Sequence, residues 1–244
     1  SGKTTAMAAR VAWLMASGSL VPGGRDADPA DHQVGAALGL TFTNKAAGSL
    51  LAGIRSSLRA LGAAGGDQPE PIVLTYNAYA ARILSQHGLR LGREPGASIL
   101  QDGARHQLAY RVVCRTSLPL ERLGRSPMSL TGDLLELDDQ CSELQVEPDA
   151  LIEFDDELVS TLESFQPLHA SVGRMRDAAL LRSVLARLVL EWREEKRRRD
   201  LLDFTDQTRL ALQIVRSFPE VAASLRAQAP VVLLDEYQDT SLAQ

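Results

Sequence analysis

The chain begins Ser1-Gly2-Lys3-Thr4-Thr5 and, near its other end, reads Val231-Val232-Leu233-Leu234-Asp235-Glu236-Tyr237-Gln238-Asp239-Thr240. The first stretch is typical of the second half of a phosphate-binding loop that leads into a helix. The second is an apolar strand that ends in two carboxylates. Together they form the two halves of a nucleoside triphosphate site in parallel-sheet proteins, so the sequence predicts a P-loop α/β fold.

A Gly-Lys-Thr sequence at a helix start has a definite electrostatic role. Backbone N–H groups of the loop and of the first helical turn point at anions, and the helix dipole favours negative charge there. We therefore expect Lys3 to reach the β- and γ-phosphates and the Thr4 hydroxyl to bind Mg²⁺. Taken alone, the stretch also fits an ordinary helix start with a solvated lysine. The expected ATP-binding residues are Ser1, Gly2, Lys3, Thr4 and Thr5.

The apolar run at 231–234 predicts a buried parallel strand whose end presents Asp235 and Glu236. In open α/β sheets, ligands bind at that edge. We expect Asp235 to hold the Mg²⁺ shell and Glu236 to orient and deprotonate the attacking water. Gln238 would hydrogen-bond at the γ-phosphate end. The alternative is an acidic surface turn after a strand, which the pairing with a Gly-Lys-Thr helix start disfavours.

The first third of the chain alternates strands and helices. Apolar periodicity predicts helices over 4–20, 44–61 and 78–87, and short apolar runs predict buried strands over 36–42 and 72–75. Thr43 and Asn44 supply capping side chains for the second of these helices. This alternation indicates a parallel sheet with helical crossovers.

From 101 to 199 the pattern is nearly all helical. We therefore predict a helical domain inserted into the sheet domain. The expected boundaries are 1–95 for the first part of the sheet domain, 96–199 for the helical insertion, and 200–244 for the return to the sheet.

The composition is that of an ordinary soluble α/β protein. Of 244 residues, 45% are hydrophobic and 23% charged, and no apolar run approaches the roughly 18 residues of a membrane helix. Cys114 and Cys141 are isolated, which favours a reducing compartment, with the cytoplasm as the default. A net charge of −5 counts against a simple basic DNA-coating protein, but not against a motor that grips a strand locally.

The stretch Asp235-Glu236-Tyr237-Gln238-Asp239-Thr240 resembles the second helicase motif of superfamily 1A, the UvrD/Rep/PcrA and RecB group. Three further segments agree. Residues 40–47 (Leu-Thr-Phe-Thr-Asn-Lys-Ala-Ala) resemble motif Ia and residues 74–84 resemble motif Ib. Residues 201–206 (Leu-Leu-Asp-Phe-Thr-Asp) resemble the Asp-Phe segment before motif II.

This resemblance implies a RecA-like domain 1A with an inserted domain 1B, ATP and Mg²⁺ as cofactors, and single-stranded DNA and single-strand/duplex junctions as partners. It implies translocation 3′ to 5′ with unwinding in DNA repair or recombination. The motif Ib and Asp-Phe segments resemble actinobacterial UvrD/RecB-type proteins, such as the two-subunit helicase–nuclease AdnA/AdnB. A motor that feeds a nuclease domain or works with a second helicase subunit is therefore an alternative.

An alternative of another class is a DNA-binding or scaffolding subunit with a degenerate ATP site, against which the intact motif residues argue. The resemblance also implies a second RecA-like domain whose arginines complete the ATP site. We therefore expect residues 1–244 alone to be inactive as a helicase.

The resemblance places the strand-binding surface at the ends of the predicted strands. Stacking on an aromatic face tolerates every base, which suits Phe42, although a core position is its alternative. Arg82 could reach a phosphate or be solvated. The family commonly has Thr-Phe-His in motif Ib, so any role of that histidine is in doubt at Asn77. The expected nucleic-acid-binding residues are Phe42, Thr43, Asn44, Thr75, Tyr76, Asn77 and Arg82.

Charged residues of the middle segment are expected on solvated helix faces. The run 191–200 is interpreted chiefly as a solvated helix end, with contact to a DNA backbone as the alternative. The acids Asp138, Asp139, Asp155, Asp156 and Glu157 are likewise expected in solvent. Trp13 and Trp192 are expected in apolar packing.

Overall fold

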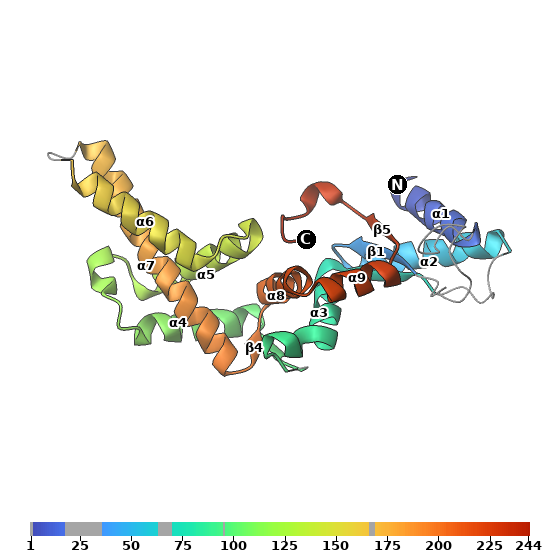
Figure 1. Cartoon of the computed structure of the whole chain (residues 1–244), viewed down its shortest axis with the longest axis horizontal. Coiled ribbons are helices and arrows are strands. Elements are labelled where there is room, and N and C mark those ends of the chain that lie inside the picture. Colours follow the sequence, from blue (N-terminus) through green and yellow to red (C-terminus); the bar gives the residue numbers. More distant parts are fainter. Residues whose placement is uncertain (1, 18–35, 63–69, 95, 166–168) are drawn as a thin grey trace. The chain divides into compact units, whose positions relative to one another are not determined.

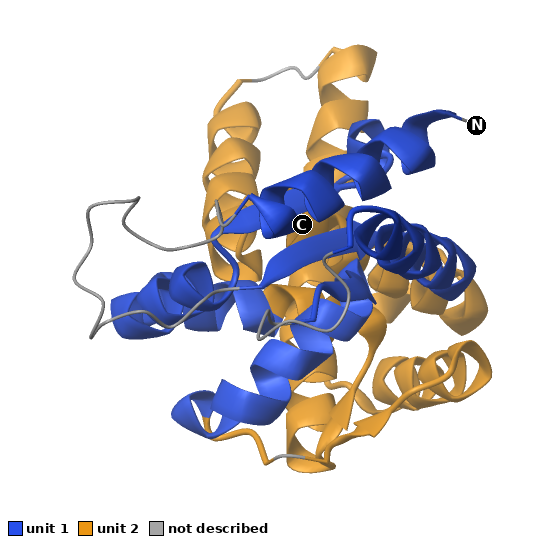
Figure 2. Cartoon of the chain, turned by 90° about the vertical axis from the view of Figure 1, so that its right-hand side faces the viewer, with its two compact units in different colours: residues 1–91, 210–240, 244 blue, residues 92–209, 241–243 orange. Residues whose placement is uncertain are grey.

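The computed structural model of this chain describes residues 2–17, 36–62, 70–94, 96–165 and 169–244. They divide into two compact units (Figure 2). Unit 1 contains residues 1–91 and 210–240 with residue 244, and unit 2 contains residues 92–209 with 241–243. The described helices include none that is long and apolar enough to cross a membrane.

Unit 1 is built on a parallel sheet of three strands in the order β2-β1-β5 (Figure 1). The strands are β1 (Ala37–Thr41), β2 (Ile72–Thr75) and β5 (Val231–Leu234). Leu40 of β1 is in register with Leu74 on one side and Leu234 on the other. The carboxyl ends of all three strands therefore lie at one edge, as the sequence predicts for the α/β fold.

Successive residues of β1 point to opposite faces of the sheet, and helices pack on both faces. Ala37 packs with helices α1 (Gly2–Ala16) and α2 (Asn44–Ala60), whereas Leu38 and Leu40 pack with Tyr76 of α3 (Tyr76–His87). Gly39 lets α2 approach closely, since a Cβ there would lie 3.2 Å from Leu50 Cδ2. The predicted helices and strands of this half are confirmed to within a few residues.

Three expectations for unit 1 are wrong. The strand β5 is at the edge of the described sheet and is not buried: Val232 is 50% and Leu234 37% exposed. Strand β2 is only half-buried along its length. Trp13 is 53% exposed and has Arg10 over its ring at 5.1 Å, because the buried face of α1 runs through Ala8, Val11 and Met15 instead.

Unit 2 is a helical assembly. Its helices are α4 (Asp102–Arg115), α5 (Pro127–Leu144), α6 (Pro148–Glu163) and α7 (Ala170–Arg198). Trp192 is fully buried in its core, as expected, together with residues such as Leu108, Leu134 and Leu188.

Short 3₁₀ turns lie at Gly88–Leu91, Leu120–Leu123 and Tyr237–Asp239 in the chain.

A small strand pair was not predicted. Strand β3 (Ser98–Ile99) pairs in parallel with β4 (Leu201–Leu202), so both ends of the helical segment are joined within unit 2. Helix α8 (Phe204–Ser217) then crosses from unit 2 to unit 1 between residues 209 and 210, and α9 (Pro219–Gln228) leads to β5. The domain limits 1–95, 96–199 and 200–244 stay predictions.

Candidate functional site

Residues from the two ends of the chain meet at the carboxyl edge of the sheet. Lys3 lies in the first turn of α1, and its Nζ atom is 3.5 Å from Glu236 Oε2, across 233 positions of sequence. Gly2, Thr4 and Thr5 share that first helical turn. Ser1 lies outside the described residues. The structure therefore brings the predicted phosphate-binding and hydrolytic residues together in unit 1.

The segment after β5 turns sharply. The Asp235 amide donates to Leu40 O at 2.9 Å, which extends the β1 ladder by one residue. Glu236 then adopts a left-handed backbone, with φ 50° and ψ 44°. Such a conformation is uncommon for a residue with a Cβ and needs support from the surrounding structure. The turn holds Glu236 beside Lys3.

The Glu236 carboxylate has two polar side-chain neighbours. Gln238 Nε2 donates to Glu236 Oε2 at 2.5 Å, and this hydrogen bond, followed by the charge of Lys3, lowers the pKa of Glu236 below its ordinary value. A carboxyl group with a lowered pKa remains ionised at neutral pH. Glu236 is therefore a carboxylate at neutral pH, and solvent reaches its side chain.

The predicted magnesium ligands are hard oxygen donors. Thr4 is half-buried in the first turn of α1, and Asp235 follows directly from β5. The described residues contain no group of three or more His, Cys, Asp or Glu that could hold a metal ion. Two oxygen donors beside a phosphate site suit Mg²⁺, which takes few protein ligands and keeps several waters.

Two aromatic rings stand at the ends of β1 and β2. Phe42 is 39% exposed, and its ring centroid lies 4.9 Å from that of Tyr76 at an interplanar angle of 49°. Tyr76 is only 6% exposed. Phe42 thus offers part of a ring face to solvent, while Tyr76 supports it from the core.

The polar strand-end residues begin helices. Thr43 Oγ1 accepts from Ala46 N and Thr75 Oγ1 accepts from Ala78 N, both at 3.1 Å. Each hydroxyl keeps its own hydrogen to donate. Asn44 and Asn77 lie in the first turns of α2 and α3, and Arg82 is half-buried further along α3. Their contact with DNA remains a prediction.

A buried charged cluster in unit 2 was missed. Lys196 is 1% exposed, and its Nζ lies 2.6 Å from Asp206 Oδ2, 2.9 Å from Asp203 Oδ2 and 3.4 Å from Asp138 Oδ2. Trp192 Nε1 donates to Asp138 at 2.9 Å. The expectation that Asp138 and the 191–200 run are solvated is therefore wrong for Asp138 and Lys196.

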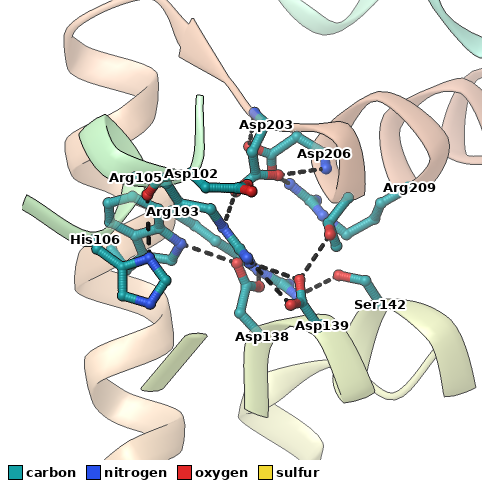
Figure 3. Close-up of polar contacts among 12 residues, drawn as sticks. Asp102, Arg105, His106, Asp138, Asp139, Ser142, Arg193, Asp203, Asp206 and Arg209 are labelled. Carbon is teal, nitrogen blue, oxygen red and sulfur yellow. Dashed lines mark hydrogen bonds and ion pairs between the residues drawn. The ribbon is translucent and has the colours of Figure 1, made fainter. Parts of the chain in front are cut away.

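Arginines complete the cluster (Figure 3). Arg105 donates to Asp139 at 2.6 and 3.2 Å and to Asp203 at 3.2 Å, and Arg193 Nε donates to Asp138 at 2.7 Å. Burial alone would lower the pKa of Lys196, but the Asp138, Asp206 and Asp203 carboxylates outweigh it and raise that pKa. The cluster joins α4, α5, α7 and the start of α8.

The start of α8 carries the one sequence signal that could have revealed this cluster. Asp206 N donates to Asp203 Oδ1 at 2.8 Å, and Asp203 N donates to Asp206 Oδ2 at 3.2 Å. This reciprocal pattern is a capping box, readable from acids three residues apart. A further buried acid, Asp155 of α6, gives no such signal. It is 0% exposed and accepts hydrogen bonds from Arg182 at 2.6 and 2.8 Å, so its predicted solvation is wrong.

Comparison with known proteins identifies the family. The family described as the UvrD/REP helicase N-terminal domain matches residues 1–244. The ATP-dependent DNA helicase UvrD1 of Mycobacterium tuberculosis (strain ATCC 25618 / H37Rv) is 28% identical over 245 residues, which are 100% of this chain and 26% of that protein. The ATP-dependent DNA helicase PcrA of Leuconostoc citreum is 25% identical over 245 residues, covering 100% and 27%.

A shorter match extends to another kind of protein. An ATP-dependent helicase/nuclease of Listeria monocytogenes serotype 4a (strain HCC23) has a subunit that is 35% identical over 89 residues, which are 35% of this chain and 6% of that protein. The chain spans about a quarter of the length of the matched UvrD1 and PcrA proteins. Because the family match runs from one end of the sequence to the other, this chain belongs to the UvrD/REP helicase N-terminal domain family.

Proposed function

We propose that this chain is the ATPase part of a DNA helicase, which couples ATP hydrolysis to 3′-to-5′ movement on single-stranded DNA and to duplex unwinding in repair or recombination. The observation that carries the proposal is the meeting of Lys3 and Glu236, 3.5 Å apart, at the strand edge that also presents Phe42. A nucleotide site and an aromatic ring on which DNA bases can stack, at the same edge of the sheet, suit a DNA motor.

The hydrolytic roles follow from chemistry and position. Lys3 and the first turn of α1 bind the phosphates, and Thr4 and Asp235 hold Mg²⁺, which would neutralise charge on the phosphate oxygens when bound. Glu236 orients the attacking water and accepts its proton. Gln238 orients the Glu236 carboxylate through its 2.5 Å hydrogen bond and would hydrogen-bond at the γ-phosphate end.

Strand binding is assigned to the residues at the ends of β1 and β2. Phe42 stacks on a base, and the hydroxyls and amides of Thr43, Asn44, Thr75 and Asn77 donate to phosphate oxygens. Arg82 adds a positive charge in the second turn of α3. Tyr76 contributes through its support of Phe42. None of these contacts reads base identity, which a translocating motor requires.

The motor of a helicase–nuclease is the second candidate. The observation that favours it is the partial match to the helicase/nuclease of Listeria monocytogenes, at 35% identity over 89 residues. A nuclease domain, or a second helicase subunit, would then act on the strands that this motor separates. Detection of strand cleavage together with unwinding would support this candidate over the simpler helicase.

The test uses the longer protein that carries this domain. We expect it to release phosphate from ATP many times faster with single-stranded DNA than without, and to displace a strand from a 3′-tailed duplex but not from a 5′-tailed or blunt one. Lys3→Ala should abolish both activities, while Arg59→Ala, at an exposed cation in the last turn of α2, serves as the matched control. DNA-independent ATP hydrolysis without strand displacement would contradict the proposal.

A further inference from the structure

Helix α6 of unit 2 leaves a row of apolar side chains in solvent. Phe154 is 59% exposed, and Phe165, just beyond the end of the helix, is 63% exposed. Leu151 and Leu158 are partly exposed, and Thr161 is exposed. These five residues follow the spacing i, i+3, i+7, i+10 and i+14, so they line one side of the helix. We call them the α6 stripe.

A different side of α6 packs against α7, which lies alongside it (Figure 1). Asp155 is 0% exposed and accepts hydrogen bonds from Arg182 of α7, and Asp156 Oδ1 accepts one from Ser183 of α7 at 2.6 Å. Asp155 lies about 100° round the helix from Phe154, since an α-helix has about 3.6 residues per turn. The contact with α7 therefore leaves the α6 stripe uncovered.

The spacing of the α6 stripe is the one that a helix presents to a second helix. Residues that alternate three and four positions apart form the a and d positions of a coiled-coil seam, where each side chain inserts between side chains of the facing helix. Single apolar residues on a surface are ordinary, but a contiguous apolar row marks an interaction site. The α6 stripe therefore has the geometry of a helix-binding surface.

The charges around the α6 stripe indicate the chemistry of its partner. Helix α6 contains no Lys or Arg, and its exposed acids Asp149, Glu153 and Glu157 have no ion-pair partner among the described residues. Asp155 and Asp156, in contrast, are paired with arginines of α7. Charges that flank a coiled-coil seam decide which helix is accepted. Unpaired carboxylates repel the phosphates of nucleic acids and of anionic lipids, and they attract Lys and Arg.

We propose that the α6 stripe binds an amphipathic helix of a partner protein, which places Leu or Ile against the stripe and Lys or Arg opposite Glu153 and Glu157. From Leu151 to Phe165 the stripe is about 21 Å long at about 1.5 Å per residue, so about four turns of the partner helix cover it. The α6 stripe lies in unit 2, and none of its residues belongs to the proposed ATP site or strand-binding surface. This interaction is therefore separate from the proposed function.

The test measures the binding of synthetic helices to the longer protein. The probes are two labelled peptides of three heptads with Leu at the a and d positions, one with Lys and the other with Glu at the flanking e and g positions. Like charges at these positions keep each peptide from pairing with itself. Fluorescence anisotropy should show saturable binding of the Lys peptide, and binding of the Glu peptide at least about tenfold weaker.

Phe154→Gln tests the apolar contact. It should weaken binding of the Lys peptide by about tenfold, because it removes a ring that the partner helix buries. The matched control is Met128→Gln, because Met128 is 70% exposed on α5 and lies outside the α6 stripe. This control should bind the Lys peptide as the parent does. Unchanged melting temperatures of both variants would show that they fold.

Reversal of charge tests the choice of partner. The double variant Glu153→Lys/Glu157→Lys should bind the Glu peptide more tightly than the Lys peptide, since the flanking charges have changed sign. Both positions are exposed, so the variant should fold as the parent does. An unchanged preference for the Lys peptide in this variant would contradict the assigned role of Glu153 and Glu157.

Three further results would overturn the proposal. The first is that the longer protein binds neither peptide, or both equally. The second is that Phe154→Gln binds the Lys peptide as tightly as the parent does. The third is that a maleimide labels Phe154→Cys much more slowly than Met128→Cys in the peptide-free protein, because another part of the same protein or a second copy then covers the α6 stripe. None of these results bears on ATP hydrolysis, which is tested separately.

Discussion

Glu236 shows how one residue depends on distant sequence. Its carboxylate is oriented by Gln238, two positions away, and by Lys3, at the far end of the chain. The left-handed backbone at Glu236 is a local strain that the β5 ladder and the following 3₁₀ turn sustain. The hydrogen bond and the ion pair act in the same direction, since both favour the ionised carboxylate that a general base requires.

Phe42→Ala should weaken the binding of single-stranded DNA by about tenfold, because stacking of a base on an aromatic ring contributes about 1–3 kcal/mol. Phe42→Trp keeps a ring and should retain most of the affinity. Fluorescence anisotropy of a labelled oligo-dT strand on the longer protein measures both variants. Unchanged affinity in Phe42→Ala would remove Phe42 from the strand-binding surface.

Sequence predicted those residues whose environment is local. The cap at Thr43 was predicted from the sequence, because a cap depends on its next three residues. The cap at Thr75 was not predicted, because the helix was expected to begin at residue 78. Burial was not readable for Trp13, Asp138 or Lys196, since it depends on which helix face meets which neighbour. A lysine within a charged run gives no sign that three carboxylates from other elements will enclose it.

At the scale of elements, the charged cluster organises unit 2. Its hydrogen bonds and ion pairs connect α4, α5 and α7 with the capping box at the start of α8. Burying these charges costs desolvation energy, which their mutual attraction offsets only when every partner is present. We therefore expect the loss of any one charged side chain of the cluster to destabilise unit 2.

Lys196→Met should lower the free energy of unfolding by about 3–5 kcal/mol, because it removes the cation that the buried Asp138, Asp203 and Asp206 carboxylates share. The exposed Lys45→Met is the matched control and should change it by less than about 0.5 kcal/mol. Urea denaturation at neutral pH measures both. Equal stability of the two variants would mean that the cluster is not an essential part of the unit 2 fold.

The same cluster predicts a pH dependence. Burial would raise the pKa of Asp206, but Lys196 and Arg209 lower it to about 2. Unfolded aspartate titrates near about 4, so the stability from Asp206 is present above that pH and is lost as pH falls towards 2. In Lys196→Met the main lowering cause is gone, so the variant's deficit in unfolding free energy relative to the parent should shrink as pH falls from about 4 towards 2. A deficit that grows on acidification would contradict this assignment.

Element types followed from periodicity, but sheet details did not. Helices α2 and α3 have amphipathic patterns, and the sequence located them within a few residues. Strands β3 and β4 have only two residues each, too short for any period. The exposure of β5 depends on its place at the edge of the sheet, which an apolar run alone does not reveal.

At the scale of the molecule, we expect residues 1–244 alone to show no DNA-stimulated ATP turnover. Within the described residues, Lys3 is the cation that the structure places beside Glu236. Charge that develops on the γ-phosphoryl group requires further stabilisation, which the family resemblance assigns to arginines of a second RecA-like domain. Phosphate release with and without oligo-dT measures this. Turnover by residues 1–244 within about tenfold of that of the longer protein would contradict the expectation.

The central claim is that the two ends of this chain form one hydrolytic site. Glu236→Gln in the longer protein tests it most directly, with the exposed Glu70→Gln as the matched control. We predict that Glu236→Gln still binds ATP but loses DNA-stimulated hydrolysis by about 10²–10⁴-fold, the contribution of a general base, while Glu70→Gln keeps the parental rate. Hydrolysis by Glu236→Gln at the parental rate would contradict the account.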